Sequence, residues 1–392
     1  IAIGRIAGHD LTSGTRNNFI GYFAGANATT ANNTIAIGTT ALSAGVLTGT
    51  DNIAIGRLTG NDLTSGAYNN FIGYTSGASA TTGDYNVAIG YAPINTGVLT
   101  GDDNIAIGRL AGQDLTSGEY NFFGGYSAGL NATTATYSVA IGSSALGTGV
   151  MTGTDNTAIG QSAGNDLTSG TYNNFMGYRA GYNATEANNT IAIGKNAIGL
   201  GVLTGDDNVA IGQFAGYDLT SGASNVFVGY SAGGNVTTGA DNTFLGPAAG
   251  DALTTGSNNI IIGHDAAASA VDVSNEITLG DANITDVRIP GVGFYINGGD
   301  VGIGQTSPSA KLDIVGTANE TVLEITSTDN NTAQAFTGVV IDTNMTGSGA
   351  TGADREHFGL YIDTDSSATG GDTSNEHRVR GLRVDTDVTG DS

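Results

Sequence analysis

Apolar and small residues alternate along most of this chain in short runs that end at a glycine. A representative run is Asn104–Gly108, NIAIG, in which Ile105 and Ile107 flank Ala106. Alternation with a period of two predicts a β-strand and does not fit the 3.6-residue period of a helix. The closing glycine indicates a corner where φ is positive or another backbone approaches closely. We therefore expect short strands, each followed by a sharp turn.

The run recurs at a nearly constant spacing in sixteen turns, whose closing glycines begin with Gly4, Gly21, Gly38 and Gly56. Three turns form a block, and blocks begin at positions 1, 53, 105, 157 and 209. A turn of this length cannot bury an apolar face alone, but stacked turns bury a continuous column. We expect an all-β fold, a parallel β-solenoid of the β-roll or left-handed β-helix type. At about 4.8 Å per turn, sixteen turns span roughly 75 Å.

Equivalent positions in successive turns form columns. Asparagines recur before the strands, where side chains one turn apart can form amide ladders. We expect the two isoleucines of each run to form the inner column. The small central residue is then expected to face outward and to allow close packing between chains, at Ala2, Ala54, Ala106, Ala158 and Ala210. The middle turn of each block carries an aromatic pair, whose phenylalanines are Phe19, Phe71, Phe123, Phe175 and Phe227.

The repeat divides the chain into three parts. We expect a solenoid shaft over residues 1–265, a connector over 266–316 and a second β-rich repeat or stalk over 317–392. The stalk contains three similar segments, in which Asp342, Asp363 and Asp385 recur at a fixed place, as a structural residue would. The chain starts inside one motif and stops soon after another, so we expect it to be a piece of a longer protein.

Composition and charge narrow the choice of partners. The formal net charge is −24 and only 12 of 392 residues are Lys or Arg, which excludes nucleic acid as an expected partner. A membrane-spanning helix needs about 20 consecutive apolar residues, and every apolar run here is much shorter, so we expect no membrane insertion. Low charge content (12 %) together with 39 % hydrophobic residues argues against a disordered chain.

Candidate chemistry is sparse. The glycine-rich loops lack the lysine of a phosphate-binding P-loop, and the four histidines have no acid and nucleophile partners that would suggest an acyltransferase. Oxygen-rich corners suit Ca²⁺, and the best candidates are Asp102, Asp103, Asp206 and Asp207 in two copies of TGDDN. Asp and Asn in turns also bond their own backbone, so a structural reading stands beside the calcium reading. We expect no catalytic residue and no other cofactor.

Two resemblances follow from particular motifs. The segments NIAIGRLAG (104–112), NFIGYTSG (70–77) and SVAIGSSA (138–145) resemble the head repeats of trimeric autotransporter adhesins. The segment VGIGQTSPSAKLDI (301–314) resembles a connector of phage tail fibres and adhesins that carry an intramolecular chaperone domain. These resemblances imply a homotrimeric extracellular fibre on a virion or a cell surface.

The expected function is therefore mechanical. We expect a non-catalytic subunit of a phage tail fibre or surface adhesin, associated with other fibre, virion or cell-surface components. It would project a tip, outside this sequence, that binds a host glycan or protein receptor. Two alternatives remain open, namely a tailspike enzyme that cleaves polysaccharide and a calcium-dependent adhesive module. Paired carboxylates in a groove would favour the first, and loss of stability with a chelator would favour the second.

Overall fold

Every regular element in residues 1–287 of the computed structural model is a β-strand, and the structure also describes residues 301–303 and 312–314. The strands are short because a glycine closes each apolar run. They are β1 (Ala2–Ile3), β2 (Asn18–Ile20), β3 (Ile35–Ile37), β4 (Ile53–Ile55), β5 (Asn70–Ile72), β6 (Val87–Ile89), β7 (Ile105–Ile107), β8 (Phe122–Gly124), β9 (Val139–Ile141), β10 (Thr157–Ile159), β11 (Asn174–Met176), β12 (Ile191–Ile193), β13 (Val209–Ile211), β14 (Val226–Val228), β15 (Thr243–Leu245), β16 (Ile260–Ile262) and β17 (Ile277–Leu279).

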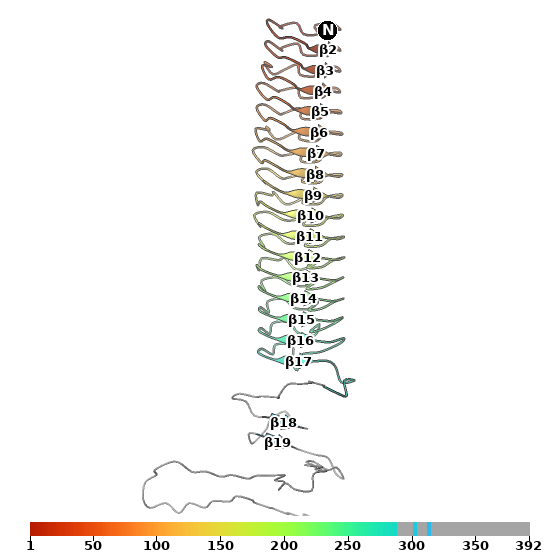
Figure 1. Ribbon diagram of the computed structural model, residues 1–392, viewed down its shortest axis with the longest axis vertical. Coiled ribbons are helices and arrows are strands. Elements are labelled where there is room, and N and C mark those ends of the chain that lie inside the picture. Colours follow the sequence, from red (N-terminus) through yellow and green to blue (C-terminus); the bar gives the residue numbers. More distant parts are fainter. Residues whose placement is uncertain (288–300, 304–311, 315–392) are drawn as a thin grey trace, which may run out of the picture. The chain divides into compact units, whose positions relative to one another are not determined.

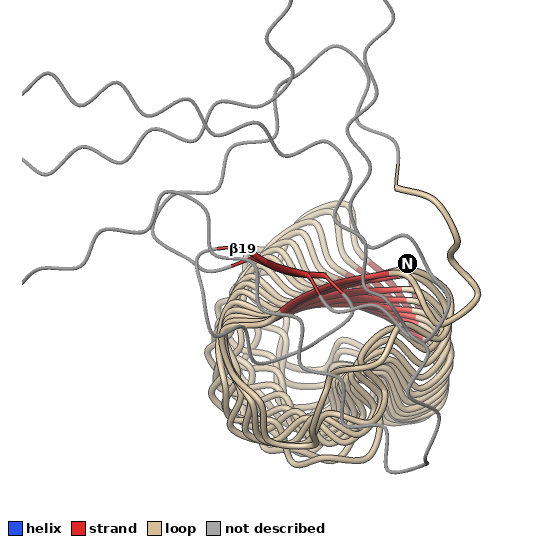
Figure 2. Ribbon diagram, turned by 90° about the horizontal axis from the view of Figure 1, so that it is seen from below, coloured by secondary structure: helices blue, strands red, loops and turns tan. Residues whose placement is uncertain are grey.

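These strands form one parallel sheet in which each strand pairs with those of the turns before and after it. Residues at the same place in successive turns are direct partners, as Ala54 of β4 is with Phe71 of β5. The strands stack in a single column (Figure 1) and line one side of the coil, while loops form the rest (Figure 2). The expected parallel β-solenoid is confirmed, with one strand in each turn.

The sheet continues one strand beyond the sixteen turns counted in the sequence. Strand β17 pairs in register with β16, although it lies in the segment expected to be the connector. Gly280 follows β17 at the place that Gly263 holds after β16, so the spacing of the repeat persists where the motif around it has changed. The compact unit that contains the sheet runs from Ile1 to Arg288.

The central residue of each strand faces the interior, so the expected orientation of the alternating residues is wrong. Four of the five alanines expected to face outward are fully buried, namely Ala54, Ala106, Ala158 and Ala210. Ala2 is exposed because it lies in the end turn, whereas Ile107 is 42 % exposed in the middle of the sheet. Ala106 is the direct partner of Phe123 in the next turn, and both side chains lie in the core.

Large side chains from several places in each block fill the rest of the core, including two in the third turn, such as Leu42 and Leu47. The central phenylalanines of the middle turns are at most 1 % exposed. A second column is formed by the leucine of the DLTSG motif, buried in the second to fifth blocks at Leu63, Leu115, Leu167 and Leu219. Alternating small and large residues along the axis let one turn's ring pack over the next turn's alanine. Full burial of a Phe or Leu side chain contributes about 1.5–3 kcal/mol.

Glycine is required where each strand ends. Gly108 has φ = 139°, and a Cβ added there would lie 2.3 Å from the carbonyl oxygen of Gly125 in the next turn. The same conformation recurs at all sixteen closing glycines counted in the sequence. The expectation of a positive φ together with a close backbone approach is therefore confirmed at these corners.

Buried asparagines join the turns inside the corner that precedes each strand. The Asn225 side chain donates to the Asn208 side-chain oxygen at 3.1 Å and accepts from the Asn242 amide nitrogen at 3.1 Å. Its amide nitrogen also donates to the Gly239 carbonyl oxygen at 2.9 Å. The expected amide ladder is confirmed, with interruptions at Thr34, Ser138 and Thr190, which occupy the same place.

The extra residue in the third turn of four blocks does not disturb the sheet. Ile35 of β3 lies opposite Ile53 of β4, although the loop between them is longer by one residue than the loop between β2 and β3. The added length is taken up in the loop, where a residue with positive φ is buried, for example Leu42 (φ 50°) and Ile94 (φ 44°). Insertion in a loop is tolerated because the strand on either side keeps its partners.

A second unit spans Ile289–Ser392. Its described part consists of β18 (Val301–Ile303) and β19 (Leu312–Ile314), which pair in parallel and lie within the VGIGQTSPSAKLDI motif. The expected stalk, including Asp342, Asp363 and Asp385, lies outside the described residues.

Candidate functional site

The outward side of the sheet is an apolar strip, which we call the outer sheet face. It consists of the first and third residues of strands β2–β16, mostly Ile, Val and Leu. Their exposure reaches 48 % at Leu245 and is 37 % at Ile72. A few positions are polar, including Asn70 and Thr157. Large apolar patches on a soluble protein generally mark a surface that binds another protein.

One edge of the outer sheet face carries aspartates and tyrosines. This entry column lies two residues before each strand, and its members have φ near 57°. Tyr68 stacks on Tyr85 with ring centroids 4.8 Å apart, and Tyr120 stacks on Tyr137 at 5.0 Å. Aspartates occupy it in the first turn of each of four blocks, at Asp51, Asp103, Asp155 and Asp207.

The opposite edge carries arginines and tyrosines. This exit column lies two residues after each strand. Arg109 lies between two rings of adjacent turns, with its guanidinium carbon 5.6 Å from the Tyr91 centroid and 5.5 Å from that of Tyr126. Arg57 makes the same contact with Tyr74 at 5.7 Å. Each cation–π contact at an exposed site contributes about 0.5–1 kcal/mol.

The two columns have opposite charge at the same height in the turns of β4 and β7, whereas Asp155 and Asp207 share their turns with Gln161 and Gln213. The turn of β4 has Asp51 on one edge and Arg57 on the other, and the turn of β7 has Asp103 and Arg109. The Asp103 carboxylate raises the pKa of the Tyr120 phenol above its usual value, with smaller contributions from Tyr137 and Glu119. One edge is therefore locally acidic and the other locally basic, in a chain of strongly negative net charge.

Two of the four aspartates considered for calcium accept hydrogen bonds from backbone N–H groups through their carboxylates. The Asp102 carboxylate accepts a hydrogen bond from the Asp84 backbone N–H at 2.7 Å, and that of Asp206 accepts one from the Asn188 N–H at 2.8 Å. Asp103 and Asp207 belong to the entry column. In the described part of the chain, no three His, Cys, Asp or Glu side chains gather as a metal site requires. The corner geometry fits the structural reading.

Histidines and glycosylation motifs show no cluster either among the described residues. His9 and His264 each pair with the aspartate that follows them, at 2.6 and 3.1 Å. The two remaining histidines, His357 and His377, lie outside the described residues. Four asparagines that begin N-x-[ST] motifs at equivalent places in four blocks donate through the side-chain amide to a carbonyl of the next turn, namely Asn27, Asn131, Asn183 and Asn235.

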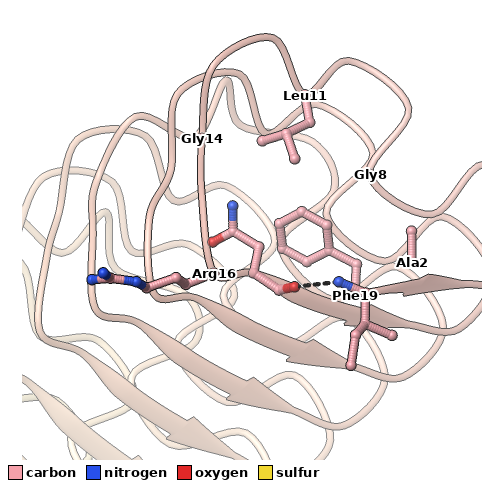
Figure 3. A pocket seen from close by; sticks show the side chains of 8 residues that line it. Ala2, Gly8, Leu11, Gly14, Arg16 and Phe19 are labelled. Carbon is pink, nitrogen blue, oxygen red and sulfur yellow. Dashed lines mark hydrogen bonds between the residues drawn. The ribbon is translucent and has the colours of Figure 1, made fainter.

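A pocket lies at the first turn, where the interior opens (Figure 3). It is lined by the Phe19 ring, Leu11 and Ala2, with Gly8 on the same wall. The Ile1 ammonium donates to the Asn17 carbonyl oxygen at 2.7 Å, which closes part of its rim. Apart from Ile1 and Arg16, the lining residues hold places that lie in the interior of later turns, so this pocket is the open end of the core.

Comparison with known proteins finds no protein-family model that matches the chain and no match among curated proteins. No helix that could cross a membrane occurs in the described residues, which form strands and loops. The functional assignment therefore depends on the surface described above. Sequence reasoning missed that surface because it placed the isoleucines inside. The polar residues at flanking strand positions, such as Asn18 and Asn70, were the signal that these positions face water.

Proposed function

We propose that this chain is a non-catalytic subunit of an extracellular fibre, in which three parallel copies pack through their outer sheet faces. The observation that carries the proposal is the apolar strip with an acidic and a basic edge. With three residues per strand and one strand per turn, the strip measures on the order of 750 Å² per chain. Each chain of a ring makes two contacts, so each contact receives roughly half of this strip together with one flanking column, whereas one partner in a standard-size stable interface contributes about 800 Å².

The edges favour a cyclic arrangement of parallel chains. In such a ring the contact is heterologous, so the entry column of one copy meets the exit column of the next. Because Asp103 and Arg109 lie in the same turn, copies in axial register bring opposite charges together at the same height. The tyrosines of β5 and β8 would meet in the same way. The number three comes from the resemblance to trimeric adhesin heads.

A long, regular solenoid suits the projection of a binding tip away from a virion or a cell. Described turns are held by hydrogen bonds between backbones and buried amides, and the described part contains no long charged loop for a protease. We assign no calcium requirement to this function. A tail fibre and a surface adhesin both fit this proposal.

Analytical ultracentrifugation of residues 1–392 tests the assembly. We expect a mass three times the chain mass of 39.1 kDa, and threefold end views of rods in electron micrographs. The double variant Ile107→Asp/Ile141→Asp should give a folded monomer, because charges on the outer sheet face cannot be desolvated.

The matched control adds the same charges away from the sheet, as Ser65→Asp/Ser117→Asp, and should remain trimeric. A monomeric parent, or an outer-face variant with an unchanged mass, would refute the proposal. Incubation with host polysaccharide provides a separate check on catalysis, since release of oligosaccharides would favour the tailspike alternative.

A further inference from the structure

A small hollow interrupts the regular surface in the fifth block. It measures about 300 Å³ and is lined by Phe214, Tyr217, Ser231, Gly234, Asn235 and Asp251. Three of these residues, Tyr217, Gly234 and Asp251, occupy the same place in three successive turns. The hollow is therefore a notch one turn high, between an aromatic side chain and a carboxylate.

Gly234 makes the notch, and the backbone does not require a glycine there. Gly234 is absent from the residues with positive φ, unlike Gly233 beside it. A Cβ at Gly234 would approach no atom closer than 3.3 Å, at the Ser231 carbonyl oxygen. The earlier blocks carry side chains at the equivalent position, namely Ala26, Ala78, Leu130 and Tyr182. What distinguishes Gly234 is thus the space that it leaves open.

Tyr217 also departs from the repeat, and it leaves the neighbouring Asp218 carboxylate without a hydrogen-bond donor. In the preceding block, Asn165 donates to the Asp166 carboxylate at 2.8 Å, and the Thr148 hydroxyl donates to the same oxygen. Around Asp218, Tyr217 and Leu200 of the turn before occupy the places of these two donors. The Asp218 Oδ1 atom is consequently buried with no hydrogen-bond partner in the described part of the chain.

The loss of hydrogen-bond donors to Asp218 indicates that Tyr217 does not stabilise the fold. A buried polar atom without a hydrogen-bond partner lowers the stability of the folded state. Burial raises the pKa of the Asp218 carboxyl, as expected for a carboxylate without donors. Local features that lower stability without structural compensation are expected mainly at functional sites.

The notch combines aromatic faces with hydrogen-bond acceptors. The Phe214 ring packs edge-to-face against Tyr217 at 5.3 Å and against Tyr230 at 6.1 Å. The Asn235 side-chain nitrogen donates to the Asp251 carbonyl oxygen at 2.7 Å, which fixes the amide and directs its oxygen elsewhere. The Asp251 carboxylate accepts no bond from the described residues. The polar groups available to a ligand are therefore mainly acceptors.

We propose that this notch binds one neutral pyranose unit of a glycan. A pyranose has an apolar C–H face that fits against an aromatic ring and a rim of hydroxyl donors that fits Asn235 and Asp251. The volume lies at the lower end of ligand pockets, which suits a single sugar ring. Asp251 and the net charge of −24 disfavour an acidic sugar. This site goes beyond the fibre function and does not depend on the oligomeric state.

Saturation-transfer NMR on residues 1–392 tests the site, with the methyl pyranosides of glucose, galactose, mannose and N-acetylglucosamine as probes. At least one probe should bind, with signal from its ring C–H protons. Gly234→Tyr should weaken binding at least tenfold, because it fills the notch with the residue found at Tyr182. Tyr217→Asn should weaken binding equally and raise the melting temperature, because the new amide reaches Asp218.

Both variants introduce a residue that the solenoid already carries at the same place, so they are expected to fold. Tyr22→Ser, in the exit column of the first block, is the control and should bind as the parent does. The proposal would be overturned if no methyl pyranoside bound, or if both notch variants bound as well as the parent. Binding of choline without binding of any sugar would also overturn it, in favour of a cation site.

Discussion

At the residue scale, the closing glycines decide whether the turns can stack. Gly108 and its equivalents combine a backbone conformation that other residues rarely adopt with a carbonyl oxygen in the space of a Cβ. The neighbouring atom belongs to the backbone of the next turn, so it cannot move as a side chain would. These positions are therefore closed to every other residue.

Gly108→Ala should lower the free energy of unfolding by at least about 2 kcal/mol, from strain and backbone contact combined. Thermal denaturation followed by circular dichroism measures the effect. Gly124→Ala is the matched control, since Gly124 lies on the outer sheet face and its Cβ would meet only the end of the Phe122 ring, at 3.1 Å. It should change stability by less than about 0.5 kcal/mol, and equal losses in both variants would contradict this account.

Asp218 provides a prediction about pH. Because burial raises its pKa in the folded state, the folded protein holds the proton more tightly than the unfolded chain. The charged carboxylate thus lowers stability at neutral pH, and this penalty disappears as pH falls through the raised pKa. Asp218→Asn should melt higher than the parent at pH 7, with a difference that shrinks toward pH 3. Asp166→Asn, whose parent carboxylate has donors, should show no such gain.

Much of this residue-level detail could be predicted from the sequence, but not which side chains of each strand face the interior. The period of two establishes that Ala106 and Ile107 face opposite sides, yet it does not say which side is inside. Hydrophobicity alone favours Ile inside. In the structure the buried side contains the alanines together with large rings such as Phe123, which pairs with Ala106. The notch at Gly234 could likewise not be predicted from the sequence, because it depends on how residues of successive turns stack.

At the element scale, each turn is stabilised mainly by its neighbours. The asparagine ladder shows this most directly, because a side chain such as that of Asn225 bonds to the turn before and the turn after. Its presence and approximate place could be predicted from the recurrence of Asn before each strand. The donors and acceptors could not, since they include backbone carbonyls of the next turn, such as that of Gly239.

Asn225→Ala should lower the free energy of unfolding by about 3 kcal/mol, because it leaves the buried N–H groups of Asn242 without an acceptor. Asn225→Ser should lose less, since Ser138 holds the equivalent place and its hydroxyl lies 3.4 Å from the Asn156 nitrogen. Chemical denaturation of both variants gives the comparison. A serine variant as unstable as the alanine variant would show that the ladder acts by packing alone.

The block of three turns is the unit that can be removed without loss of register. Deletion of residues 105–156 joins Asn104 to Thr157, so β10 takes the place of β7 beside β6. We expect a folded solenoid with unchanged strand signal in circular dichroism. Deletion of residues 105–130, half a block, should give a protease-sensitive product, because Asn104 would then join Asn131 in the middle of a turn. Equal protease resistance of the two deletions would argue against register as the controlling factor.

At the scale of the whole molecule, repulsion between acidic residues lowers the stability of the folded chain. The chain carries 36 acidic and 12 basic residues, and the ion pairs among the described residues are two exposed His–Asp contacts. Self-repulsion of this kind is long-range and is screened by salt. Assembly with other copies would increase the density of charge while covering the outer sheet face.

Raising sodium chloride from 20 to 500 mM should therefore raise the melting temperature of the full chain. The same concentrations of a neutral osmolyte, such as sorbitol, serve as the control for effects unrelated to screening. Differential scanning calorimetry at both salt levels gives the measurement. A fall in melting temperature with salt would show that attractive pairs, such as Asp103 with Arg109 of a neighbouring copy, outweigh the repulsion.

The orientation of the strands has a mechanical consequence. Strands lie across the axis of the solenoid, so the hydrogen bonds between turns point along it. A pull along the axis therefore loads the bonds of one turn after another rather than all of them together. The force that a single chain withstands is set by its weakest turn, whatever the length of the array. Each turn that opens releases roughly 55 Å of extended chain, so the array yields in steps and absorbs work under tension.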